Sequence, residues 1–229
     1  MNSMLYISAC SMVYCILLAL QVFKDKQKTV GKKLLRYLII SNFISLSLEV
    51  LGFAIGGKYE DNALMTDISL RFMLINSVLW MTIFFVFTYN ISRDSKDKKT
   101  FDKKLLPVYL LGFVFIGLTI LLPIKYGMRN GEIAYTYGKA VDATFLHAIL
   151  IYGLSLISMF KGIKRVKATN YAFLFALISL GAFSFSIQST YPELTLSSTV
   201  CTLINYIIYF TIQSNTYNKV VDDNKKGDK

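Results

Sequence analysis

Seven long apolar runs constrain this chain more than any other feature of its sequence. Each has about 20 residues with almost no charge, the length that an α-helix needs to cross the hydrocarbon core of a bilayer. The 229 residues are 54% hydrophobic and 17% charged, with a mean hydropathy of +0.48. The sequence therefore predicts an all-α, polytopic membrane protein with seven transmembrane helices, at Leu5–Phe23, Leu35–Gly56, Ile68–Ile91, Leu105–Ile124, Ala140–Phe160, Tyr171–Ser189 and Leu194–Gln213.

The basic residues predict the orientation of these spans. Of the 25 lysine and arginine residues, all but Lys58, Arg71, Lys125, Arg129 and Lys139 lie in or directly beside the first, third and fifth connecting segments or in the C-terminal tail. Basic segments are retained in the cytoplasm, so we expect the N-terminus outside and the C-terminus inside, at the plasma membrane. Topology thus explains the net charge of +11. The lysines form no continuous basic face, so the expected partner is the lipid bilayer and not nucleic acid.

Residues with catalytic or metal-binding chemistry are few. The cysteines Cys10, Cys15 and Cys201 and the single histidine, His147, all lie inside apolar runs. No metal-ligand spacing, HExxH, GxSxG or phosphate-binding loop is present, so we expect no enzyme, metal site or cofactor in this chain. His147 is interpreted either as a neutral side chain hydrogen-bonded to a neighbouring helix or as a ligand or proton contact within the bundle.

The charges of Glu49 and Arg71 lie inside predicted spans. Glu49 is in the second span and Arg71 in the third, both toward the outer side. A charge at that depth costs several kcal/mol unless it is paired. Because a short outer loop joins the two spans, the sequence predicts that they are adjacent and antiparallel and that Glu49 and Arg71 form an ion pair. The pair either holds the helices together or lines a ligand cavity.

Small and polar residues form a stripe along each of two predicted spans. Such stripes face other helices instead of lipid. They are interpreted either as helix packing or as the walls of a central polar pocket. The stripes are Asn42, Ser45, Glu49, Gly52 and Gly56 in the second span and Ser198, Thr202, Asn205 and Tyr209 in the seventh.

Four short motifs resemble the seven-helix N-terminal membrane region of bacterial sensor proteins, chiefly Firmicutes histidine kinases and diguanylate cyclases. They are Leu79 to Phe85, Tyr135 to Val141, Ile187-Gln188 with Pro192-Glu193-Leu194, and Tyr209 to Ile212. Lys139 stands where the family commonly has proline, and Gln213-Ser214-Asn215 where an acidic residue, Asn and Pro usually follow. The resemblance implies a sensor whose seventh helix leads to a cytoplasmic kinase or cyclase.

The expected organisation is a seven-helix sensor domain over residues 1–213 and a charged cytoplasmic tail over 214–229. The sensor would bind a small-molecule or peptide signal on its outer side, as a homodimer, and pass it through the seventh helix to an output in cis or in trans. The alternative is a small-solute transporter or permease subunit. The candidate ligand-binding or signalling residues are Glu49, Arg71, Tyr137, His147, Gln188 and Asn205.

Overall fold

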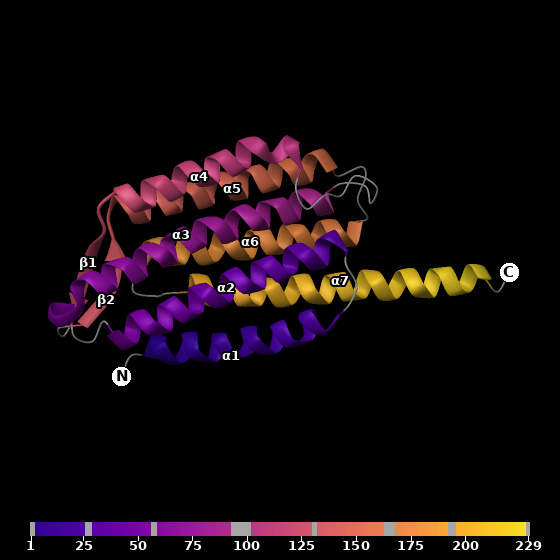
Figure 1. Ribbon diagram of the computed structural model, residues 1–229. Coiled ribbons are helices and arrows are strands. Elements are labelled where there is room, and N and C mark those ends of the chain that lie inside the picture. Colours follow the sequence, from indigo (N-terminus) through magenta and orange to yellow (C-terminus); the bar gives the residue numbers. More distant parts are fainter. Residues whose placement is uncertain are drawn as a thin grey trace.

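The computed structural model describes residues 3–25, 29–55, 59–92, 102–129, 132–162, 168–191 and 196–227, and Figure 1 shows their arrangement. This part of the chain forms seven α-helices, a short 3-10 helix and one β-hairpin. They are α1 (Ser3–Lys24), α2 (Val30–Ile55), α3 (Tyr59–Ile91), η3 (Lys103–Leu105), α4 (Leu106–Leu121), β1 (Lys125–Arg129), β2 (Glu132–Tyr137), α5 (Lys139–Gly162), α6 (Ala168–Thr190) and α7 (Ser197–Gly227).

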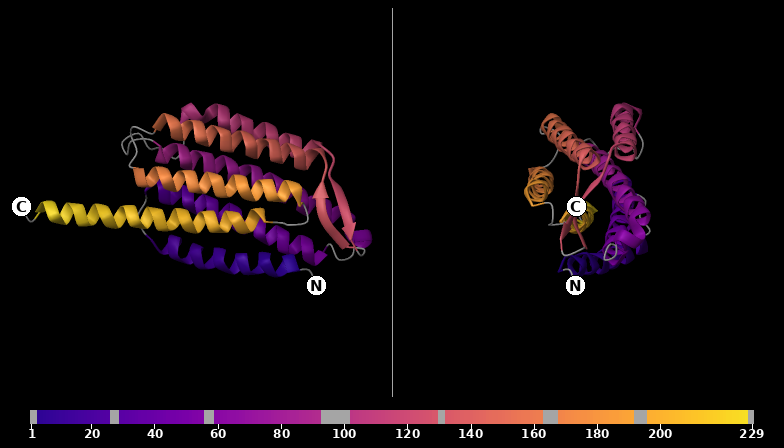
Figure 2. Two further views of the ribbon diagram at one scale, coloured as in Figure 1. Left: turned by 180° about the vertical axis from the view of Figure 1, so that it is seen from behind. Right: turned by 90° about the vertical axis from the view of Figure 1, so that its left-hand side faces the viewer.

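The helices lie side by side and alternate in direction, so the bundle has two ends (Figures 1 and 2). The N-terminal end holds the start of α1, the start of α7 and the β-hairpin. The C-terminal end holds the starts of α2, α4 and α6, and α7 projects beyond it. Helix α3 packs on α2, α4 and α5, whereas α7 packs on α1, α2 and α6. The predicted adjacency of the second and third spans is therefore confirmed.

Within the described residues, six helices, α1 to α6, are long and apolar enough to cross a membrane. Large apolar side chains on them point away from the bundle, including Phe113 at 70% exposure and Leu121 at 82%. So much exposed apolar surface on long helices is typical of contact with lipid, and it indicates a multi-pass membrane protein. Helix α7 is less apolar because Ser198, Thr202 and Asn205 occupy its buried face and its distal part is charged.

Aromatic and branched side chains from several helices fill the centre of the bundle. Trp80 stacks on Phe84 with ring centroids 5.4 Å apart, and Phe84 meets the edge of Tyr152 at 6.2 Å. Leu38 of α2 and Ile208 of α7 are completely buried in the same cluster. This apolar contact holds α2, α3, α5 and α7 in fixed positions relative to one another.

The hairpin was expected only as a loop between the fourth and fifth spans. Lys125 pairs with Tyr137 and Tyr126 with Thr136 in an antiparallel ladder, with an irregularity after Gly127. The chain then turns into α5 at Gly138, whose φ of 109° lies in the left-handed region. A Cβ there would approach the Pro123 carbonyl oxygen to 3.1 Å, so glycine is required at this turn.

Candidate functional site

Side-chain hydrogen bonds join α1, α2, α3 and α7 in the half of the bundle toward its N-terminal end. Helix α2 is hydrogen-bonded to each of the other three, because different residues of its polar stripe face different neighbouring helices. Ser8 of α1 donates to Glu49 Oε1 at 2.9 Å, and both residues are buried. Asn76 of α3 donates to Ser45 Oγ at 2.6 Å.

Asn42 connects the same stripe to α7. With its amide turned to donate to the Ser198 carbonyl oxygen at 3.1 Å, it accepts from Thr202 Oγ1 at 2.7 Å. All three residues are buried. The two stripes predicted from the sequence thus meet at Asn42 and Thr202, which confirms that they face other helices at these positions.

The remaining described residues of the two stripes do not take part in the Asn42–Thr202 contact. A Cβ added at Gly52 would meet no atom within 4 Å, so Gly52 makes no close helix contact. Tyr209 accepts a hydrogen bond from Gln213 of its own helix at 3.1 Å. Asn205 is completely buried, and its amide has no hydrogen-bond partner among the described residues. Gly56 lies outside the described residues.

A groove of about 540 Å³ lies between α1 and α7 next to this network. This is the volume of a small-molecule site. Ser11 donates to Thr199 Oγ1 at 2.9 Å where α1 and α7 meet, and Tyr206 donates to the Tyr14 carbonyl oxygen at 2.9 Å. Hence an occupant of the groove would touch residues that connect α7 to α1. The α1–α7 groove is lined by Tyr6, Ile7, Cys10, Ser11, Tyr14, Thr199, Thr202, Leu203 and Tyr206.

The predicted ion pair between Glu49 and Arg71 is wrong. Arg71 forms its salt bridge with Asp67, one turn earlier on α3, with Nε 2.8 Å from Oδ2. Arg71 Nη1 also donates to the carbonyl oxygens of Thr119, Ile120 and Leu122 at 2.9–3.0 Å. The guanidinium therefore sits at the C-terminal end of α4, where unpaired carbonyls and the negative end of the helix dipole favour a cation.

Asp67 extends this arrangement to the hairpin, because Tyr126 of β1 donates to its Oδ1 at 2.6 Å. The sequence contains a signal for the Asp67–Arg71 pair, since oppositely charged residues four apart on a helix are neighbours. The predicted pair of Glu49 and Arg71 took account only of the adjacent span. The geometry fits a clamp that fixes α3, the end of α4 and β1 together.

The other candidate residues occupy separate positions. His147 of α5 is completely buried, with its ring 5.1 Å from that of Phe115, and neither ring nitrogen has a hydrogen-bond partner within the described ranges. The hydrogen bond to a neighbouring helix, one of the two interpretations of His147, is thus not found in this part of the chain. Tyr137 ends β2 and is 44% exposed, with its ring 5.9 Å from Tyr135.

Gln188, near the end of α6, contacts the start of α7. Its Oε1 accepts from the Ser197 backbone N–H at 3.2 Å and from the Ser197 hydroxyl. The first N–H groups of a helix have no partner inside the helix, so this contact satisfies one of them. Gln188 therefore connects the end of α6 to the first residue of α7.

A polar stripe on α1, of which Ser11 lines the groove, was missed at the sequence level. Ser8, Ser11 and Cys15 recur at steps of three and four, the same spacing that defined the other two stripes. Cys10 also faces the groove and is exposed. In the described part of the chain, no group of three or more His, Cys, Asp and Glu side chains could hold a metal ion.

Comparison of the sequence with known protein families and with curated protein sequences gives no match.

Proposed function

We propose that this chain is the membrane-embedded sensing module of a signalling protein, and that a small molecule or peptide bound in the α1–α7 groove acts through α7. The observation that carries this proposal is the course of α7. It begins beside the groove and continues as one helix from Ser197 to Gly227, past the end of the bundle (Figure 1). At 1.5 Å per residue, its 31 residues extend over roughly 46 Å.

The proposed orientation follows from the charges. All seven helices would cross the plasma membrane, with the N-terminal end outside, because the lysine-rich segments are expected in the cytoplasm. The groove would then open toward the outer leaflet, and the projecting part of α7 would enter the cytoplasm. An output such as a kinase or cyclase, in cis or in trans, would receive the signal there, and a homodimer is the expected assembly.

The proposed mechanism uses the contacts around Thr202. Thr202 lines the groove and also contacts Asn42, so an occupant competes directly with a contact that fixes α7 on α2. A ligand shifts the population of two helix arrangements only by its difference in affinity for them. A difference of about 3 kcal/mol changes such a ratio more than a hundredfold, which a few altered contacts can supply.

Cys10 allows the groove to be filled without knowledge of the ligand. Benzyl methanethiosulfonate attaches a benzyl group to an accessible thiol through a disulfide. We expect this modification to change hydrogen–deuterium exchange in α7, on both the groove side and the projecting side, in the full chain in lipid nanodiscs. Exchange in α4 should stay unchanged, because α4 is not part of the groove.

The matched control is Cys10→Ala, which retains Cys15 and Cys201 but cannot carry the group in the groove. If the modified protein and this control show the same exchange in α7, groove occupancy does not act on α7 and the proposed function fails. The transporter alternative makes a different prediction: modification of Cys10 should block solute flux in proteoliposomes and leave the projecting part of α7 unaffected.

A further inference from the structure

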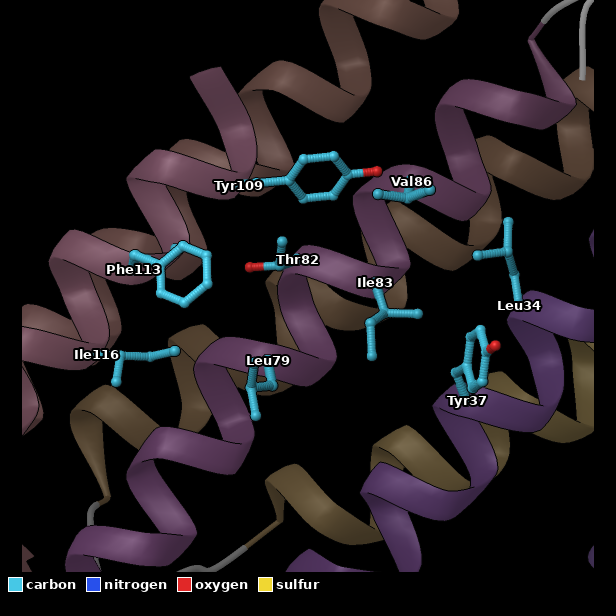
Figure 3. Close-up of a pocket in the computed structure, with 10 residues that line it drawn as sticks. Leu34, Tyr37, Leu79, Thr82, Ile83, Val86, Tyr109, Phe113 and Ile116 are labelled. Carbon is cyan, nitrogen blue, oxygen red and sulfur yellow. The ribbon is translucent and has the colours of Figure 1, made fainter. Parts of the chain in front are cut away.

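A second groove runs along α3 on the surface of the bundle, between α2 and α4. Figure 3 shows Thr82 and Ile83 of α3 at its floor, Tyr109 and Phe113 of α4 on one side and Tyr37 of α2 on the other. Its volume is about 290 Å³. The groove extends from Leu79 to Val86 along α3, which is two helical turns or roughly 10 Å.

The groove offers an almost entirely apolar surface. The Thr82 hydroxyl already donates to the Val78 carbonyl oxygen at 2.8 Å. Gly112 lets α4 approach α3 closely, since a Cβ there would come within 3.0 Å of Thr82 Oγ1. Phe113 and Leu79 remain substantially exposed along the rim. A groove of this shape and polarity, on helices long enough to cross a membrane, fits a hydrocarbon chain.

Three exposed lysines lie at the end of this groove nearest the C-terminal end of the bundle. Lys33 is one turn before Tyr37 on α2, and Lys103 and Lys104 directly precede α4. None of the three forms a salt bridge within the described residues, whereas the neighbouring Lys32 pairs with Asp25. Among the described residues next to Lys103 and Lys104, Asp102 carries a carboxylate, which accepts from the Lys104 backbone N–H at 3.0 Å. The local balance of these four side chains is therefore positive.

We propose that the α2–α3–α4 groove binds one anionic glycerophospholipid of the leaflet at the C-terminal end. One acyl chain lies in the groove, and the phosphate is held by Lys33, Lys103 and Lys104. The apolar groove favours the acyl chain, and the lysines favour the phosphate. Along the membrane normal, the groove and the lysines follow each other in the same order as the tail and headgroup of a lipid. This inference depends on the membrane location but not on the proposed sensing function.

Native mass spectrometry of the full chain in detergent tests this site, with phosphatidylglycerol and phosphatidylcholine of identical acyl chains as probes. We expect about tenfold tighter binding of phosphatidylglycerol, because each lysine near an anionic headgroup favours binding. The combined variant Lys33→Gln, Lys103→Gln and Lys104→Gln should lose this preference. The matched control, Lys24→Gln with Lys161→Gln, changes exposed lysines at the same end of the bundle and should retain it.

A second pair of variants tests the groove itself. Leu79→Trp fills it and should weaken binding of both lipids, whereas Leu110→Trp changes an exposed α4 residue outside it and should not. Should Leu79→Trp fail to fold, Phe113→Ala removes one wall at an exposed position and should also weaken binding. Equal binding of the two lipids, retention of the preference without the three lysines, or a dimer that excludes the lipid from this face would each overturn the proposal.

Discussion

Arg71 is the residue whose surroundings differ most from expectation, and it supports a prediction at the residue scale. Arg71→Gln should lower the free energy of unfolding by roughly 2 kcal/mol, because it removes a charged donor from Asp67 and from three carbonyl oxygens at the end of α4. Thermal unfolding in detergent measures the effect. Combining it with Asp67→Asn should cost less than the sum of the single losses, because the two residues interact.

Glu49→Gln is the matched control for that cycle. Its effect and that of Arg71→Gln should add, since Ser8 and not Arg71 contacts the Glu49 carboxylate. Non-additivity between Glu49 and Arg71 would restore the ion pair first predicted. The sequence could identify both residues as charges that need partners. The spacing of four residues favours Asp67 as the partner of Arg71, but whether Glu49 also faces Arg71 depends on the rotation of each helix about its axis.

At the scale of elements, Thr202 reports how α7 is held. Thr202→Val removes a hydroxyl at nearly constant volume, so the hydrogen bond from Thr202 Oγ1 to Asn42 is lost, whereas the bond from Asn42 to the Ser198 carbonyl oxygen remains. We expect a loss of about 1 kcal/mol in unfolding free energy, typical of a hydrogen bond between membrane helices. Hydrogen–deuterium exchange in α7 should also increase, which a general loss of packing would not confine to that helix.

Thr211→Val provides the control on the same helix, because the Thr211 hydroxyl donates to the Ile207 carbonyl oxygen one turn earlier. It should change stability by less than about 0.5 kcal/mol. Equal effects of the two substitutions would mean that the Asn42–Thr202 contact contributes nothing specific. Periodicity was sufficient to predict the two stripes, because a helix places residues three and four apart on one face. Prediction of the α1–α7 groove would require the distance between α1 and α7. That distance is set by helix packing and not by a local sequence pattern.

The same distinction explains which elements the sequence could predict. Runs with almost no charge predicted the helices α1 to α6, but α3 begins at Tyr59 and not at Ile68, because polar residues extend a helix beyond its apolar part. The hairpin of β1 and β2 was missed because its strands are short and depend on pairing with each other. Helix α7 continues from Ser197 to Gly227 through position 213, where the membrane domain was expected to end.

At the scale of the whole molecule, the number of spans depends on whether α7 crosses the membrane along with the six more apolar helices. Single cysteines at Tyr137, Tyr191, Lys103, Lys161 and Lys219, in a background lacking Cys10, Cys15 and Cys201, answer it with an impermeant thiol reagent on intact cells. Tyr137 and Tyr191 lie toward the N-terminal end and should react from outside, whereas Lys103 and Lys161 should react only after permeabilisation, because basic segments are retained in the cytoplasm.

Lys219, on the projecting part of α7, then decides the number of spans. Seven spans place it with Lys161, whereas six spans place it with Tyr191. Asn205 and its polar neighbours make α7 costly to insert alone, but the contacts of α7 with α1, α2 and α6 cover this face. We therefore expect Lys219 to be protected in intact cells, and external labelling there would exclude a signal passing through α7 to the cytoplasm.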